Sequence, residues 1–109
     1  MKKVFLIFVL ACLTAACGMT AAASTETLKV EGLCGMCKTR IENTAKEVNG
    51  VTKAEWNRDT KMLTLEFDSA KVKMETISKA IAKAGHDTEK DKADDGVYDG
   101  LPGCCKYRG

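Results

Sequence analysis

Histidine and proline are nearly absent from this sequence of 109 residues, which contains one of each, His86 and Pro102. Around the single histidine there is no arrangement of nucleophile and base, and the chain has no glycine-rich phosphate loop. Aromatic residues make up only 6% of the composition. We therefore expect a small protein that is not an enzyme.

The sequence also lacks an excess of charge of one sign. It has 17 Lys and Arg against 15 Asp and Glu, for a formal net charge of +2. Loss of Lys2 and Lys3 with an N-terminal leader would leave a formally neutral domain, with 15 residues of each sign. A nucleic-acid-binding surface needs a basic face or stripe, so we expect no nucleic-acid partner.

Only one long apolar run is present, at residues 4–13, and it follows Lys2 and Lys3. Small residues at 21–23 complete the pattern of a secretory signal, and the run is too short to span a bilayer. Residues 13–18 also resemble a bacterial lipoprotein box in which Cys17 would be lipidated. We expect residues 1–23 to be a signal peptide, or a lipoprotein signal that ends before Cys17. Either reading predicts an exported protein of the periplasm or envelope, bound to the membrane only through lipidation at Cys17.

Hydrophobic periodicity predicts six elements in the remaining chain. Apolar residues alternate in the segments 27–31, 51–58 and 62–67, which indicates strands, and recur at helical spacing over 37–48 and 74–84. The segment 86–90 has poor β-propensity and is a candidate last strand. Right-handed crossovers then give an α+β fold, the ferredoxin-like βαββαβ sandwich, with two helices on one face of a four-stranded antiparallel sheet. Residues 24–90 would form this domain, and residues 91–109 a flexible tail.

The strand-to-helix turn carries a Cys-x-x-Cys pair, Cys34 and Cys37. A helix N-terminus favours negative charge, so both thiols should have lowered pKa values. Two thiolates on a turn can hold a soft ion such as Cu(I), or they can form a disulfide. Zn(II) requires four ligands, and His86 or the tail cysteines Cys104 and Cys105 could supply the others.

Three sequence segments resemble the heavy-metal-associated domain family: Gly-Leu-Cys-Gly-Met-Cys-Lys-Thr-Arg-Ile-Glu at 32–42, Val-Asn-Gly-Val at 48–51 and Ala-Ile-Ala-Lys-Ala-Gly at 80–85. This family includes copper chaperones, modules of metal-pumping ATPases and periplasmic mercury-binding proteins. The resemblance implies the same βαββαβ sandwich, with Cys34 and Cys37 as metal ligands. The metal loop is one residue shorter than is usual in the family. The segment with Cys104 and Cys105 is an addition to the family pattern.

His86 follows Ala-Gly, a position that lies close to the metal loop in the family, and is a candidate third ligand. Cys104 and Cys105 are adjacent and rarely bond each other, because a disulfide needs Cα atoms farther apart than neighbouring residues allow. They could instead form a disulfide with Cys34 or Cys37, bind the same ion, or pass metal to a partner.

Together these observations predict an exported soft-metal-binding protein that transfers its ion by thiolate ligand exchange. Cu(I) is the first choice, with Hg(II), Zn(II) or another soft divalent ion as alternatives. The expected partner is a metal transporter or efflux component with thiol ligands. A thiol–disulfide redox protein that uses Cys34 and Cys37, or a mercury or zinc scavenger, is the alternative function.

Overall fold

The structure is a computed structural model, and it describes residues 23–109. The expected signal segment, apart from Ala23, and Cys17 lie outside the described residues. Between Ala23 and Gly109 no helix combines the length and the apolar character that a membrane span requires.

Three strands form an antiparallel sheet in the order β1-β3-β2. They are β1 (Ala23–Lys29), β2 (Val51–Trp56) and β3 (Met62–Asp68). The central strand, β3, buries every second side chain, Leu63, Leu65 and Phe67, as its alternation predicts. Leu63 pairs with Leu28 of β1 on one side and with Trp56 of β2 on the other, which fixes the register of the sheet.

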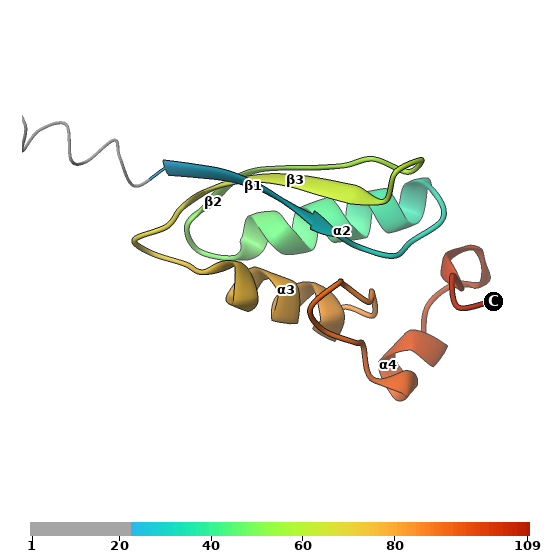
Figure 1. Ribbon diagram of the computed structural model, residues 1–109. Helices are drawn as coiled ribbons and strands as arrows, with labels where there is room; N and C mark the ends of the chain where they lie inside the picture. The colour runs from blue at the N-terminus through green and yellow to red at the C-terminus, as the bar shows by residue number, and fades with distance from the viewer. Residues whose placement is uncertain (1–22) are drawn as a thin grey trace, which may run out of the picture.

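Two longer helices, α2 (Gly35–Glu47) and α3 (Met74–Lys83), lie on the same side of the sheet (Figure 1). α2 buries Cys37, Ile41 and Ala45, which are four residues apart and therefore share one face. α3 buries Met74, Ile77 and Ile81 by the same periodicity. These side chains and those of the sheet form one continuous core.

The expected fourth strand at 86–90 is not formed, so the described residues form a three-stranded sheet. A single bridge joins Thr88 to Val30, with Glu31 N donating to Asp87 O at 2.8 Å on one side of it. The physical reason lies in Thr88, whose side-chain oxygen accepts from the N–H groups of Lys90 (3.0 Å) and Asp91 (2.9 Å). Such local bonds turn the chain and compete with extension of a ladder.

The chain after Lys90 returns to the domain and forms a short helix, α4 (Asp95–Asp99), and one 3-10 turn, η1 (Gly103–Cys105). Tyr98, Leu101 and Cys105 are buried against the core, where a flexible tail was expected. This C-terminal segment ends beside the turn between β1 and α2 (Figure 1).

Candidate metal centre

Cys34 and Cys37 lie where the chain enters α2. Cys34 is the N-cap residue, with an extended backbone, and its carbonyl accepts the first helical hydrogen bond from Lys38 N at 3.0 Å. Cys37 is in the first turn and is fully buried, whereas Cys34 is partly exposed. Their Sγ atoms are 3.7 Å apart. The turn therefore presents one thiol near the surface and one beneath it.

Both tail cysteines reach this turn. Cys34 Sγ lies 3.2 Å from Cys104 Sγ and 3.7 Å from Cys105 Sγ, and the two tail sulfurs are 4.0 Å apart. Every pair in this group of three lies within 4.8 Å, a spacing that can hold a metal ion. We call Cys34, Cys37, Cys104 and Cys105 the sulfur cluster. All four are free thiols, and the thioether of Met36 lies 3.6 Å from Cys104 Sγ.

The thiols of the metal turn differ in acidity. The hydrogen bond with Cys104, followed by the backbone N–H of Cys37, lowers the pKa of Cys34 to about 6. Burial raises the pKa of Cys37 to about 11. The expectation that the helix N-terminus lowers both values was therefore wrong for Cys37, because loss of hydration outweighs the helix effect at a buried thiol. At neutral pH, Cys34 supplies the thiolate.

His86 is fully buried beside the sulfur cluster, and both of its ring nitrogens have partners. Nδ1 lies 2.8 Å from the carbonyl oxygen of Glu31, and Nε2 lies 3.3 Å from Arg40 Nη1. A neutral ring that donates from Nδ1 and accepts at Nε2 satisfies both contacts. Burial, and then the charge of Arg40, lower the pKa of His86, which favours this neutral form. His86 is thus close to the cluster without a free nitrogen to offer it.

Arg40 lies beside the sulfur cluster, although the sequence did not identify it as a candidate site residue. Its Nη1 lies 3.4 Å from Cys105 Sγ as well as 3.3 Å from His86 Nε2. Arg40 follows Cys37 by three positions, which places both on the same face of α2. That spacing was the sequence signal for Arg40. Its contact with Cys105 could not be predicted from the spacing, because it depends on the tail folding back onto the domain.

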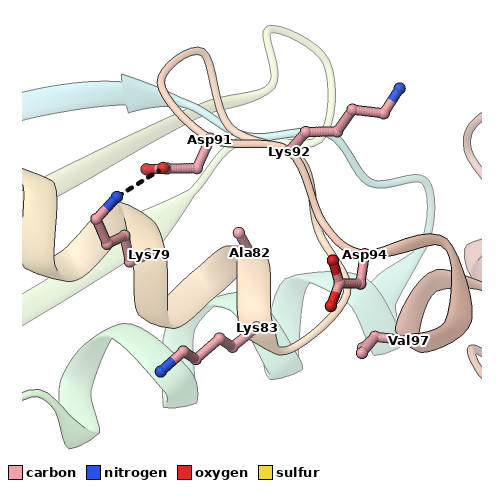
Figure 2. A pocket seen from close by; sticks show the side chains of 7 residues that line it. All are labelled: Lys79, Ala82, Lys83, Asp91, Lys92, Asp94 and Val97. Carbon is pink, nitrogen blue, oxygen red and sulfur yellow. Dashed lines mark hydrogen bonds and ion pairs between the residues drawn. The ribbon is translucent and has the colours of Figure 1, made fainter.

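A depression that shares no residues with the sulfur cluster lies between α3 and the start of the tail (Figure 2). Its volume is about 290 Å³. Its lining residues are Lys79, Ala82, Lys83, Asp91, Lys92, Asp94 and Val97. Lys79 is paired with Asp91 at 3.2 Å across it, and none of the lining residues is a thiol. The soft-ligand chemistry therefore lies at the sulfur cluster.

Comparisons with known proteins agree with this fold. The family model of the heavy-metal-associated domain matches residues 27–87. The copper chaperone CopZ of Staphylococcus aureus is 37% identical over 65 residues, which cover 59% of this chain and 96% of the chaperone. The mercuric transport protein periplasmic component of Pseudomonas aeruginosa is 36% identical over 87 residues, which cover 79% of this chain and 93% of that protein.

Among solved structures, a copper-binding domain from HMA7, a P-type ATPase, matches with a TM-score of 0.58 and 32% identity, covering 60% of this chain and 89% of that domain. The chain belongs to the heavy-metal-associated domain family. Its fold is the ferredoxin-like fold of that family, with three strands in the sheet that the described residues form. Cys34 and Cys37 fall within the matched residues, whereas Cys104 and Cys105 lie beyond them.

Proposed function

We propose that this protein binds a soft metal ion, Cu(I) in preference to others, through the sulfurs of Cys34 and Cys37, with Cys37 releasing its proton as the ion binds, and transfers the ion to a partner. The observation that carries the proposal is the convergence of thiol sulfurs on Cys34, with Cys37 at 3.7 Å and Cys104 at 3.2 Å. Thiolate and thioether ligands select Cu(I) and related soft ions over hard cations. The named relatives, a copper chaperone and a mercuric transport component, support binding and transfer over catalysis.

The transfer step follows from the exposure of the turn. Cys34 is partly exposed and flanked by the exposed side chains of Leu33 and Met36, so a second protein can approach it. An incoming thiolate forms a bond to the ion, which becomes three-coordinate, and one bond to Cys34 or Cys37 then breaks. A second partner thiolate displaces the remaining sulfur in the same way, so that the ion leaves the protein. The oxidation state of the ion is unchanged. The buried Cys37 holds the ion from beneath while Cys34 faces the partner.

The ion, the partner and the compartment are inferred from chemistry and resemblance. Hg(II) accepts two thiolates as Cu(I) does, whereas Zn(II) prefers four ligands, and the sulfurs within 4.8 Å of one another are the three of Cys34, Cys104 and Cys105. A P-type ATPase domain with the same fold supports a thiol-bearing metal transporter as the partner.

The N-terminal apolar run, and the relative described as a periplasmic component, support a location outside the cytoplasm. Lipidation at Cys17 would be seen as a diacylglyceryl mass in the membrane fraction.

A titration of the reduced protein with Cu(I) against a chromophoric chelator tests the function. The protein should take one ion from the chelator, and the double variant Cys34→Ser, Cys37→Ser should lose that capacity. Thr39→Ser, an exposed change on α2, is the matched control. Unchanged affinity in the double variant would refute the proposal. Parallel titrations with Hg(II) and Zn(II) rank the ions.

A thiol–disulfide redox function is the second candidate, because Cys34 combines a pKa of about 6 with a neighbouring thiol at 3.2 Å. Low-pKa, accessible thiols next to a resolving cysteine are typical of redox proteins. Catalysed reduction of insulin that persists in the presence of a metal chelator would favour this function over metal transfer.

A further inference from the structure

The C-terminal segment is fixed on both sides of its cysteine pair. Before it, Leu101 packs so closely over Gly85 that a Cβ at Gly85 would lie 2.9 Å from Leu101 Cδ2. After it, the Tyr107 hydroxyl donates to Gly85 O at 2.6 Å and accepts from Asp87 N at 2.8 Å. Cys105 is fully buried between these anchors. The position of the pair beside Cys34 is therefore a property of the folded tail.

The sulfur separations fit a shared ion. With metal–sulfur bonds of about 2.3 Å, three sulfurs in a plane around one ion lie about 4.0 Å apart, and two sulfurs on opposite sides lie about 4.6 Å apart. The separations among Cys34, Cys104 and Cys105 are 3.2, 3.7 and 4.0 Å. Changes of at most about 0.8 Å bring them to the three-sulfur geometry. The 3.7 Å between Cys34 and Cys37 must open by about 0.9 Å to reach the linear two-sulfur geometry.

We propose that Cys104 and Cys105 complete, with Cys34, a three-sulfur site for one soft cation, and that they occupy the positions that a partner's thiolates would otherwise take. The proposal rests on the metal-binding function proposed above. The tail would make this protein retain its ion, and release would require Cys104 and Cys105 to dissociate from the ion. Among the described residues, Met36 is a further soft donor at the edge of this site, 3.6 Å from Cys104 Sγ.

The exchange that moves the ion onto the tail balances without an oxidant. Two bonds form, from the ion to the sulfurs of Cys104 and Cys105, and each thiol releases its proton to water. The bond to Cys37 breaks, and that sulfur takes up one proton. The bond to Cys34 persists throughout. A partner must compete with thiols tethered in the same chain, whose effective concentration is on the order of millimolar or higher.

Two measurements on the reduced full chain loaded with one equivalent of Cu(I) test this inference. X-ray absorption should count three sulfur ligands in the wild type and two in Cys104→Ser, Cys105→Ser. Transfer of Cu(I) to a chromophoric chelator should be at least tenfold faster from the double variant. Cys104→Ser alone should also accelerate transfer, and because Cys104 is exposed, this change leaves the core intact. Val97→Ser, at an exposed tail position, is the matched control and should behave as the wild type.

Two sulfur ligands in every protein, with equal transfer rates, would overturn the tail site. That result would leave the proposed function standing, because Cu(I) would still be bound by two thiolates. Failure of the wild-type chain to take up Cu(I), Hg(II) or Zn(II) would instead refute the function itself and the tail site with it. The two failures are therefore distinguishable in one set of samples.

Discussion

Cys34 Sγ and Cys104 Sγ lie 3.2 Å apart although 70 positions separate the two residues in the sequence. One belongs to the N-cap of α2 and the other to the turn η1. Their contact joins the part of the chain that matches the metal-binding family to the part that lies beyond the match. It also lowers the pKa of Cys34, the partly exposed thiol of the metal turn.

Replacing Cys104 by Ala should raise the pKa of Cys34, because the hydrogen bond between these thiols is the largest cause of its lowered value. In the wild type, alkylation of Cys34 should increase with pH around a midpoint near 6, since the thiolate is the reactive form. In Cys104→Ala the midpoint should move toward the ordinary value of 9.0. Mass spectrometry of quenched reactions identifies the modified residue. A wild-type midpoint near 9 would contradict the assigned role of Cys104.

Gly32→Ala should disturb the metal turn. A Cβ at Gly32 would lie 3.1 Å from both Cys37 Cβ and Trp56 Cη2, and Trp56 is held in place by donating from Nε1 to Val30 O at 3.0 Å. We expect a loss of stability of about 1–3 kcal/mol, typical of overpacking, together with weaker metal binding. Gly35→Ala is the matched control, because nothing lies within 4 Å of its Cβ position. Denaturant unfolding and Cu(I) titration of both variants provide the comparison.

His86→Phe should destabilise the fold without changing the number of sulfur ligands on a bound ion. The substitution leaves Glu31 O and Arg40 without the ring nitrogens that they contact at 2.8 and 3.3 Å. A buried group that loses its partner costs about 1–3 kcal/mol. X-ray absorption of the wild type should show sulfur ligands alone. A nitrogen ligand that disappears in His86→Phe would establish His86 as a ligand and contradict a site made of sulfur ligands alone.

Arg108→Gln should loosen the tail. Arg108 donates to Asp87 from Nη2 at 2.8 Å and to Asp95 from Nη1 at 2.9 Å. Burial alone would raise the pKa of Asp87, but Arg108 and the N–H of Ala93 lower it on balance. This contribution to stability is therefore present at neutral pH and is lost as the pH falls through the lowered pKa of Asp87.

The buried Cys105 thiol reports on this prediction. Its reaction with a disulfide reagent at neutral pH should be several-fold faster in Arg108→Gln than in the wild type. Lys83→Gln, which removes an exposed charge from α3, should leave the rate unchanged. Equal protection of Cys105 in all three proteins would show that the Arg108 contacts do not hold the tail.

The strands and helices with a regular hydrophobic pattern could be predicted, because the spacing of their apolar residues determines which side chains are buried. Leu63, Leu65 and Phe67 alternate, and Ile77 and Ile81 repeat at helical distance, so their faces could be assigned without knowledge of their partners. The segment 86–90 could not be assigned in this way. Its conformation depends on Thr88, whose hydroxyl lies 2.5 Å from that of Ser78 on α3 as well as bonding its own chain.

The cysteines of the site could be identified from the sequence, but their arrangement in space could not. Spacing and resemblance identified Cys34 and Cys37, and the notable pair Cys104 and Cys105 was visible as a motif. Their meeting depends on anchors that are distant in sequence, such as Tyr107 against Gly85. The opposite pKa shifts of Cys34 and Cys37 also follow from burial, which the local motif does not specify. Long-range packing therefore determines the relative positions of the four cysteines and the pKa values of Cys34 and Cys37.

The most direct test of the account uses Cys34, the residue shared by the metal turn and the three-sulfur site. The measurement is the Cu(I) affinity of reduced Cys34→Ser, determined by chelator competition beside the wild type and Thr39→Ser. We predict that Cys34→Ser lowers the affinity at least a hundredfold, while Thr39→Ser binds as the wild type does. Wild-type affinity in Cys34→Ser would contradict the claim that the soft-metal site is centred on this thiolate.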